Sequence, residues 1–199
     1  MKNLEEEEIK IILVGETGTG KTSLINTACG LKFNEGQEES TTTASFLTKI
    51  IKIDGKSYTI NLWDTIGQEK FRALTKIFIK DSKIVVFVFD ITRKETFDEL
   101  TFWMNTIDQV LGKDAILGVV GNKQDLFVQE QVKEEEIQKF AEEKEIPFKY
   151  TTAKNPMMFN TFLEDLLKKY IEKCGGKIEG SNGKKLEDGE NEKKGKKCC

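Results

Sequence analysis

The sequence predicts an α/β fold in which helices cover both faces of a mostly parallel, six-stranded sheet. Short apolar runs alternate with helical segments along the chain, which is the pattern of a parallel sheet. One run, KIVVFVFD at residues 83–90, is almost continuously apolar, as expected for a strand covered on both faces. With 199 residues, 38% of them hydrophobic, the chain is long enough for one domain with a substantial core.

The expected elements follow from these periodicities. Strands are expected at residues 9–14, 46–53, 58–63, 83–90, 116–121 and 146–150. Helices are expected at residues 22–30, 95–111, 132–144 and 159–173. Asp54-Gly55 joins the second and third strands and is typical of a two-residue hairpin turn. In the 95–111 helix, the large apolar side chains fall along one stripe.

Composition excludes several classes of function. The chain has no histidine, so Ser-His-Asp triads, histidine-ligated zinc and histidine general bases are excluded. Its four cysteines lack zinc-finger spacing, and a domain of this size needs no disulfides, so a reducing compartment is expected. Arg72 and Arg93 are the two arginines, which argues against a nucleic-acid partner read by arginine forks.

Charge divides the chain unevenly. The net charge is −3, but residues 173–199 hold eight lysines and five acidic residues, about +3, which leaves about −6 on residues 1–172. We expect an acidic extension at residues 1–8 with no signal-peptide core, a folded domain at 9–173, and a tail at 174–199 too poor in apolar residues to fold. The chain lacks the long apolar run of a membrane-spanning helix.

A phosphate-binding loop is indicated at Gly15–Thr22 (GETGTGKT), which fits G-x-x-x-x-G-K-[ST] between a strand and a helix. Its backbone N–H groups and the helix N-terminus would hold phosphate oxygens. Lys21 would place its charge on the outer phosphates, and the Thr22 hydroxyl would bind Mg2+. The motif alone does not choose between ATP and GTP, and a glycine-rich turn with a surface lysine would read the same way.

A base-recognition motif is indicated at Asn122-Lys123-Gln124-Asp125, after the strand that ends at Gly121. The Asp125 carboxylate can accept hydrogen bonds from the N1–H and the exocyclic amine of guanine together, whereas adenine offers no such donor pair. Lys123 can lay its methylene stem against the purine. Four residues alone make a weak signal, but downstream of a phosphate loop they favour a guanine nucleotide.

Hydrolysis and switching are indicated by two further segments. Asp64-Thr65-Ile66-Gly67-Gln68 follows a strand: Asp64 would hold Mg2+ through water, the Gly67 N–H would sense a γ-phosphate, and Gln68 would orient the attacking water. Ser40-Thr41-Thr42-Thr43 lies in a polar loop, where one hydroxyl would complete the Mg2+ shell when a triphosphate is bound. The alternatives are a strand-end aspartate in a turn and a plain solvated loop.

Together these residues resemble the Ras superfamily of small GTPases, and within it the Rab family. The similar segments are INLWDTIGQEKF (60–71), VFVFDIT (86–92), GVVGNKQDL (118–126) and TTAK (151–154). The resemblance implies a Ras-like G domain, a P-loop NTPase fold, that binds GTP and GDP with Mg2+. It also implies that Phe33 packs against guanine and that the Ala153 N–H reaches guanine O6 beside Lys154. Thr41 matches the magnesium-binding threonine of switch I if the loop carries one inserted residue, and Thr42 is the alternative.

The resulting site prediction is a catalytic Gln68 and a magnesium shell of Thr22, Thr41 and Asp64. The predicted nucleotide-binding residues are Gly15, Thr17, Gly18, Thr19, Gly20, Lys21, Thr22, Ser23, Phe33, Thr41, Gly67, Asn122, Lys123, Asp125, Thr152, Ala153 and Lys154.

The resemblance implies a GTP/GDP switch that hydrolyses GTP slowly, because no arginine lies in the switch I loop to act in cis. The implied partners are an exchange factor, an activating protein, effectors, a prenylation escort and a GDP-dissociation inhibitor, around a monomer. Ile66 stands where most relatives have alanine, so a GTP-binding scaffold with weak turnover is the alternative function. A metabolic P-loop kinase is disfavoured by the guanine motif.

A lipid anchor is implied at Cys198 and Cys199, which follow the lysine-rich segment KKGKK. In a Rab-like chain this pair resembles a site of double geranylgeranylation, and two lipids with nearby lysines suffice for stable membrane attachment. Two exposed thiols in a frayed tail are the alternative. The expected location is the cytoplasmic face of intracellular membranes, in exchange with the cytosol.

Overall fold

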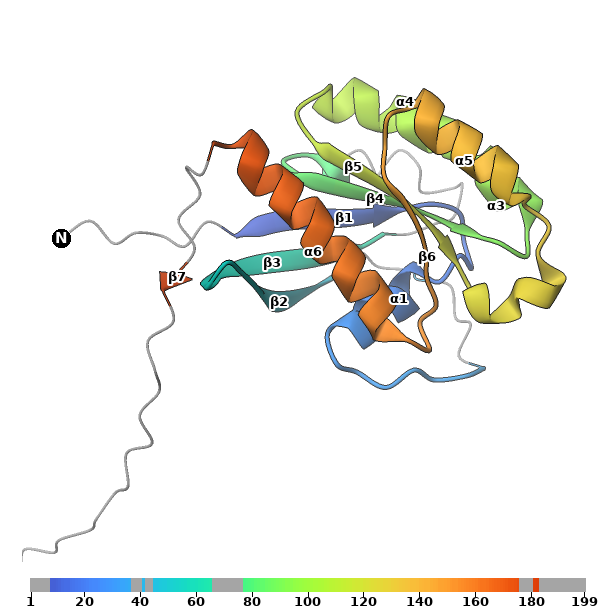
Figure 1. The fold of residues 1–199 in the computed structure, drawn as a ribbon, viewed down its shortest axis with the longest axis horizontal. Helices are drawn as coiled ribbons and strands as arrows, with labels where there is room; N and C mark the ends of the chain where they lie inside the picture. Colours follow the sequence, from blue (N-terminus) through green and yellow to red (C-terminus); the bar gives the residue numbers. More distant parts are fainter. Residues whose placement is uncertain (1–7, 37–40, 42–44, 66–76, 176–180, 183–199) are drawn as a thin grey trace, which may run out of the picture.

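A twisted sheet in the order β2-β3-β1-β4-β5-β6 forms the centre of the molecule (Figure 1). The structure is a computed structural model and describes residues 8–36, 41, 45–65, 77–175 and 181–182. β2 runs antiparallel to β3, and the other neighbours among these six strands are parallel. The six strands are β1 (Ile9–Val14), β2 (Ser45–Ile53), β3 (Lys56–Asp64), β4 (Ile84–Asp90), β5 (Ile116–Asn122) and β6 (Phe148–Tyr150).

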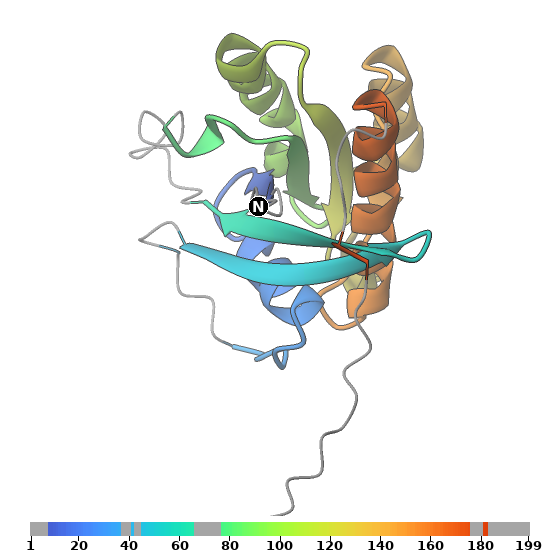
Figure 2. The same cartoon turned by 90° about the vertical axis from the view of Figure 1, so that its left-hand side faces the viewer.

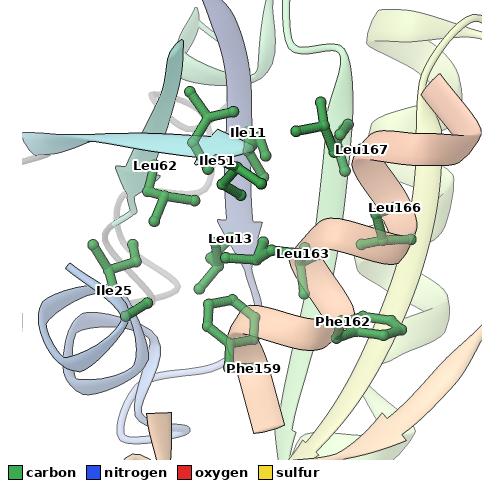
Figure 3. Close-up of a cluster of buried hydrophobic side chains, with 14 of the residues drawn as sticks. Ile11, Leu13, Ile25, Ile51, Leu62, Phe159, Phe162, Leu163, Leu166 and Leu167 are labelled. Atoms are coloured by element: carbon green, nitrogen blue, oxygen red, sulfur yellow. The ribbon is translucent and has the colours of Figure 1, made fainter. Parts of the chain in front are cut away.

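Helices cover both faces of this sheet, as predicted (Figures 1 and 2). One face is covered by α1 (Lys21–Ala28) and α6 (Pro156–Lys173), and the other by α3 (Lys94–Asp98), α4 (Leu100–Leu111) and α5 (Glu134–Glu143). Each face therefore has its own apolar core, and β4, buried at all seven positions, lies between them. In Figure 3, Phe159 and Leu163 of α6 meet Leu13 of β1 and Ile25 of α1 in the first core.

Parallel pairing brings the chemistry-bearing strand ends to one edge of the sheet. β1 pairs with β3 on one side and β4 on the other, and Asp90 at the end of β4 lies opposite Asn122 at the end of β5. The loops after β1, β3, β4 and β5 therefore leave from the same edge, which is where ligands bind in open α/β sheets.

The predicted hairpin turn at Asp54-Gly55 is confirmed, with φ of 49° and 79° at the two residues. The helix predicted at 95–111 is divided at Glu99, whose ψ is only −9°, although backbone hydrogen bonds continue across it from Glu99 to Glu95 and from Trp103 to Glu99. A 3-10 helix, Gln124–Gln129, follows β5 in a segment for which the sequence predicts no element.

A two-residue strand, β7 (Ser181–Asn182), lies within the tail that the sequence predicts to be disordered. It pairs antiparallel with Lys56 and Ser57 of β3. β1 begins to pair with β3 only at Ile60, so the edge of β3 before that residue has backbone groups that β1 does not use. Within the described ranges, no helix is both long and apolar enough to span a bilayer.

Candidate functional site

A cavity of about 780 Å³ opens at the carboxyl edge of the sheet. Its volume is typical of a pocket that binds a cofactor or nucleotide. It is lined by Thr17, Gly18, Gly20, Lys21, Thr22, Ser23, Asn26, Thr27, Lys32, Phe33, Asn34, Glu35, Gly36, Thr41, Thr65, Arg93, Asn122, Lys123, Asp125, Leu126, Thr152, Ala153 and Lys154. Segments far apart in the sequence, predicted separately to bind phosphate, cation and base, thus meet around one space.

The phosphate loop is held against the strand ends by positions that only glycine can occupy. Gly15 has a φ of 147°, and a Cβ there would lie 2.1 Å from the carbonyl oxygen of Val88. Gly20 has a φ of 90°, and a Cβ there would lie 2.4 Å from Nδ2 of Asn122. Both φ values are in the region that side chains disfavour, and Gly20 is the N-cap of α1. The free N–H groups at the start of α1 therefore line the cavity, which suits an anion.

Lys21 is buried at the base of this loop. Its ammonium nitrogen donates to the carbonyl oxygens of Gly15 and Glu16, both at 2.8 Å. Burial lowers the pKa of Lys21 to about 8, although the carboxylates of Asp64 and Glu16 oppose this shift. A bound phosphate would favour the charged ammonium, so Lys21 is placed as a point charge for the anion.

Three oxygen-bearing side chains converge beside Lys21. The Thr22 hydroxyl donates to Oδ2 of Asp64 at 2.6 Å, and the Thr41 hydroxyl lies 2.8 Å from Thr22 Oγ1 and 3.4 Å from Asp64 Oδ2. Asp64 is only 4% exposed, and burial raises its pKa despite the opposing hydrogen bond from Thr22 and the charge of Lys21. Its second oxygen, Oδ1, is buried and has no hydrogen-bond partner among the described residues.

This cluster fits the magnesium ion that the phosphate-binding loop implies. Hydroxyl and carboxylate oxygens are the ligands of a small hard cation, and Mg2+ usually keeps waters and takes one or two protein ligands besides phosphate. A carboxylate that is buried with one oxygen free can accept hydrogen bonds from those waters. Thr22, Thr41 and Asp64 are therefore the residues that would hold the ion.

The base-recognition motif is braced against the phosphate loop. Asn122 donates from Nδ2 to the carbonyl oxygen of Thr19 at 2.8 Å and accepts from the Thr151 hydroxyl at 3.4 Å. Its role is to join the end of β5 to the loop after β1 and the loop after β6. The sequence motif predicted this residue, but not that its partner is a backbone carbonyl of the phosphate loop.

Asp125 is oriented by two side chains of the segment after β6. Thr152 Oγ1 donates to Asp125 Oδ1 at 2.6 Å, and Lys154 Nζ lies 3.2 Å from Oδ2. Burial raises the pKa of Asp125, but these hydrogen bonds outweigh it and leave the pKa below its ordinary value. The group is therefore an anionic acceptor, as guanine recognition requires.

Phe33 and Ala153 complete the base end of the cavity. Phe33 is 37% exposed, and the ammonium of Lys154 lies 5.9 Å from the centre of its ring. Lys154 also pairs with Glu35 at 2.6 Å, so it links the loop after α1 to Asp125. Ala153 is buried at 6% exposure and lines the cavity.

Two residues that the sequence did not assign to the site connect the base motif to the phosphate loop. Asp90 lies at the end of β4, 1% exposed, and its Oδ2 pairs with Lys123 at 2.9 Å and with Nε of Arg93 at 3.1 Å. Arg93 also donates to the carbonyl oxygen of Thr17 at 2.9 Å. The signal that could have found them is position, because Asp90 ends a strand between the strands that carry the two motifs.

Some predicted residues lie outside the described ranges. These are Ile66, Gly67 and Gln68 of the hydrolysis segment, Ser40, Thr42 and Thr43 of the switch loop, Arg72, and the lipidation pair Cys198 and Cys199. Thr41 is described, and it lies in the cluster with Thr22 and Asp64.

Comparison with known proteins agrees with this geometry. The sequence model of the Ras family matches residues 10–172. Ras-related protein Rab-21 of Bos taurus is 38% identical over 163 residues, which cover 82% of this chain and 73% of that protein. The chain belongs to the Rab-type small GTPases of the Ras family. Rab-11C of Dictyostelium discoideum is 37% identical over 169 residues, 84% of this chain and 75% of that protein.

Family membership gives the cavity its ligand and its reaction. As a Rab-family GTPase, the chain binds GTP and GDP, hydrolyses GTP and acts as a switch in vesicle traffic. The predicted Rab resemblance and the Ras-like fold are thereby confirmed.

Proposed function

We propose that this Rab-family GTPase is a slow, magnesium-dependent timer whose domain spans residues 9–173. The observation that carries the proposal is the contact of Thr41 with Thr22 and Asp64, because it joins the loop after α1 to the phosphate loop and to the end of β3. A γ-phosphate beside that cluster would favour this joined arrangement, and its loss on hydrolysis would weaken it. The state of the nucleotide is thereby transmitted to the loop surface.

Different residues of the cavity are proposed to bind the phosphates and the base of the nucleotide. The backbone of Gly15 to Gly20 and the Lys21 ammonium hold the phosphates, with Thr17, Gly18, Thr19 and Ser23 in the same loop and first helical turn. Asp125 reads guanine, with Lys123 and Phe33 on the base and Thr152, Ala153 and Lys154 shaping its edge. Gly67 would sense the γ-phosphate and Gln68 would orient the attacking water.

Hydrolysis without a partner should be slow. The one described arginine, Arg93, is engaged by Thr17 and Asp90 rather than free to neutralise charge on a transferring phosphate. Arginine supplied by an activating protein speeds related GTPases by about 10^3- to 10^5-fold. An activating protein of that kind and an exchange factor are therefore the regulators we propose.

Effectors are proposed to dock beside the switch loop. Phe46 of β2 is 48% exposed and stacks on Trp63 of β3, with ring centres 4.9 Å apart. Trp63 in turn lies 6.4 Å from the ring of Phe78, next to Ile77, which is 67% exposed. Exposed apolar groups gathered this way are typical of a protein-binding surface.

Membrane attachment is proposed through lipids on Cys198 and Cys199, with an escort protein for prenylation and a GDP-dissociation inhibitor for return to the cytosol. The nearby lysines would add attraction to anionic lipid, about 1 kcal/mol each. The intact mass of the protein from its own cells tests this. Two added geranylgeranyl groups are expected, and a mass without them contradicts the proposal.

Retention of nucleotide tests the timer itself. Fluorescent GDP loaded with Mg2+ should be retained for many minutes, and the matching ADP should not be retained. Chelation of Mg2+ with EDTA should accelerate GDP release, because Thr22 and Asp64 then lose the cation that they would hold beside the phosphates. Equal retention of ADP, or release that does not respond to EDTA, would count against the proposal.

A further inference from the structure

Arg93 lies over the phosphate loop although it belongs to a different part of the chain. It follows β4 as the N-cap residue of α3. One guanidinium nitrogen donates to the Thr17 carbonyl oxygen at 2.9 Å, and a Cβ built on Gly18 would lie 3.2 Å from the same group. The side chain thus covers the Thr17–Gly18 peptide.

We propose that Arg93 is a positioning residue that locks this peptide with the Gly18 N–H turned toward the nucleotide phosphates. In a trans peptide, the carbonyl of one residue and the N–H of the next point in opposite directions. Holding the Thr17 carbonyl against the guanidinium therefore fixes the direction of the Gly18 N–H. The inference rests on guanine-nucleotide binding by this cavity.

A hydrogen bond that fixes this peptide matters because Gly18 has a φ of 76° and no side chain to restrict its backbone. Glycine populates both signs of φ with similar ease, so this peptide plane could otherwise turn over. In the turned arrangement a carbonyl oxygen, rather than an N–H, would face the phosphates. The guanidinium hydrogen bond favours one of the two arrangements before the nucleotide binds.

The anchor of Arg93 is itself rigid. Oδ2 of Asp90 accepts a hydrogen bond from Nε of Arg93. Its other oxygen, Oδ1, accepts hydrogen bonds from the backbone N–H of Thr92 at 2.9 Å and from the Thr92 hydroxyl at 2.7 Å. Oδ2 also pairs with Lys123, at 2.9 Å. One buried carboxylate therefore holds a residue that braces the phosphate loop and a residue of the base motif.

The test is the rate of nucleotide release from the purified full chain loaded with fluorescent GDP or with a non-hydrolysable GTP analogue. We expect Arg93→Ala and Arg93→Gln to release both nucleotides faster, by about ten-fold, the loss of one charge-assisted hydrogen bond. Arg93→Lys should fall between, because an ammonium lacks the fork that serves Asp90 and Thr17 together. The 31P resonances of bound GDP should also shift in the alanine variant.

Lys94→Ala is the matched control. Lys94 is the next basic residue along the chain, but its ammonium pairs with Asp98 and Glu136, away from the cavity. Its removal should leave nucleotide release and the 31P resonances unchanged.

Two results would overturn the inference. Release unchanged in both Arg93→Ala and Arg93→Gln would mean that the peptide needs no lock. Acceleration confined to the triphosphate analogue would mean that Arg93 contacts the γ-phosphate directly. Failure of the wild-type chain to retain GDP would instead refute the proposed function, so the two failures are distinguishable.

Discussion

At the scale of single residues, we propose that selectivity for guanine depends on the charge state of Asp125. Hydrogen bonds from Thr152 and Lys154 hold its pKa below the ordinary value in spite of burial. An anionic carboxylate with both oxygens placed in the cavity accepts from two donors and donates to none. A base that offers acceptors instead would meet electrostatic repulsion.

Asp125→Asn should therefore change the preferred base from guanine to xanthine. In xanthine a carbonyl replaces the exocyclic amine of guanine. The asparagine NH2 can donate to that carbonyl, whereas it cannot accept both donors of guanine. We expect GDP affinity to fall by about 10^2-fold or more and xanthosine diphosphate affinity to rise, because polar pockets discriminate strongly. Competition binding of the two nucleotides measures this, and Asp108→Asn on the exposed side of α4 is the control.

A second prediction distinguishes the two candidate threonines of the switch loop. Thr41→Val removes the hydroxyl that lies 2.8 Å from Thr22, so the GTP-bound protein should need more Mg2+ to retain its nucleotide. The GDP-bound protein should change less, because the proposed role of this hydroxyl requires the γ-phosphate. Titration of nucleotide release against free Mg2+ gives the measurement.

Thr42→Val is the matched variant for this titration, since it removes a hydroxyl of the neighbouring residue. If Thr42→Val raises the Mg2+ requirement and Thr41→Val does not, the assignment of Thr41 is wrong.

Motif residues could be predicted from the sequence because spacing alone places them after strands. Lys21, Asn122 and Asp125 were found this way, and all three line or brace the cavity. Asp90 and Arg93 carry a weaker signal, because an aspartate and an arginine three residues apart look like any surface ion pair, and only the place of Asp90 at a strand end points to the site. Only the parallel pairing of β4 with β1 and β5 brings them to the loop.

At the scale of elements, the close approach of α6 to β5 depends on Gly118. A Cβ there would lie 2.8 Å from Cζ of Phe162 and 2.9 Å from Cδ1 of Leu166. Neither distance is tolerated without movement of the helix side chains, so the absence of a side chain lets α6 lie directly on the strand.

Gly118→Ala should lower the free energy of unfolding by about 1–3 kcal/mol through this overpacking. In a Phe162→Leu background, which removes the Cζ atom, the same alanine should cost less. A double-mutant cycle of denaturant unfolding measures the coupling. An alanine substitution that costs the same in both backgrounds would show that the contact with Phe162 is not what limits the approach.

Strand positions could be predicted closely because a buried strand appears in the sequence as a run of apolar residues with polar residues or glycine at its ends. β1 was predicted at Ile9–Val14 and is found there. Helix ends are harder to locate from the sequence. α6 begins at Pro156, three residues before the predicted start, because the Asn155 side chain caps the helix by accepting a hydrogen bond from the Met157 N–H. The division at Glu99 has no sequence signal, because only its ψ of −9° departs from helical values and no proline or glycine lies there.

At the scale of the whole molecule, the nucleotide site and the proposed membrane attachment lie in parts of the chain with opposite charge. The part of the chain that precedes the tail holds the nucleotide site, and the lysines of the tail precede the proposed lipid attachment. The net charge of −3 conceals this opposition of sign, because about −6 lies on residues 1–172, half of it within residues 1–8, and about +3 on residues 173–199. We propose that charges of the same sign on residues 1–172 and on an anionic bilayer keep the nucleotide site away from the surface to which the tail would attach.

Single-turnover hydrolysis of bound GTP in the presence of Mg2+ decides whether this molecule is a slow GTPase. We predict conversion of GTP to GDP and phosphate at about 10^-4 to 10^-3 per second, the range of a GTPase without an arginine in cis. A glutamine-to-leucine change at Gln68 should slow this further, since the water-orienting group is lost. No detectable turnover in the wild-type protein would favour the GTP-binding scaffold, and a rate of about one per second or more without a partner would show that the protein is not a slow timer.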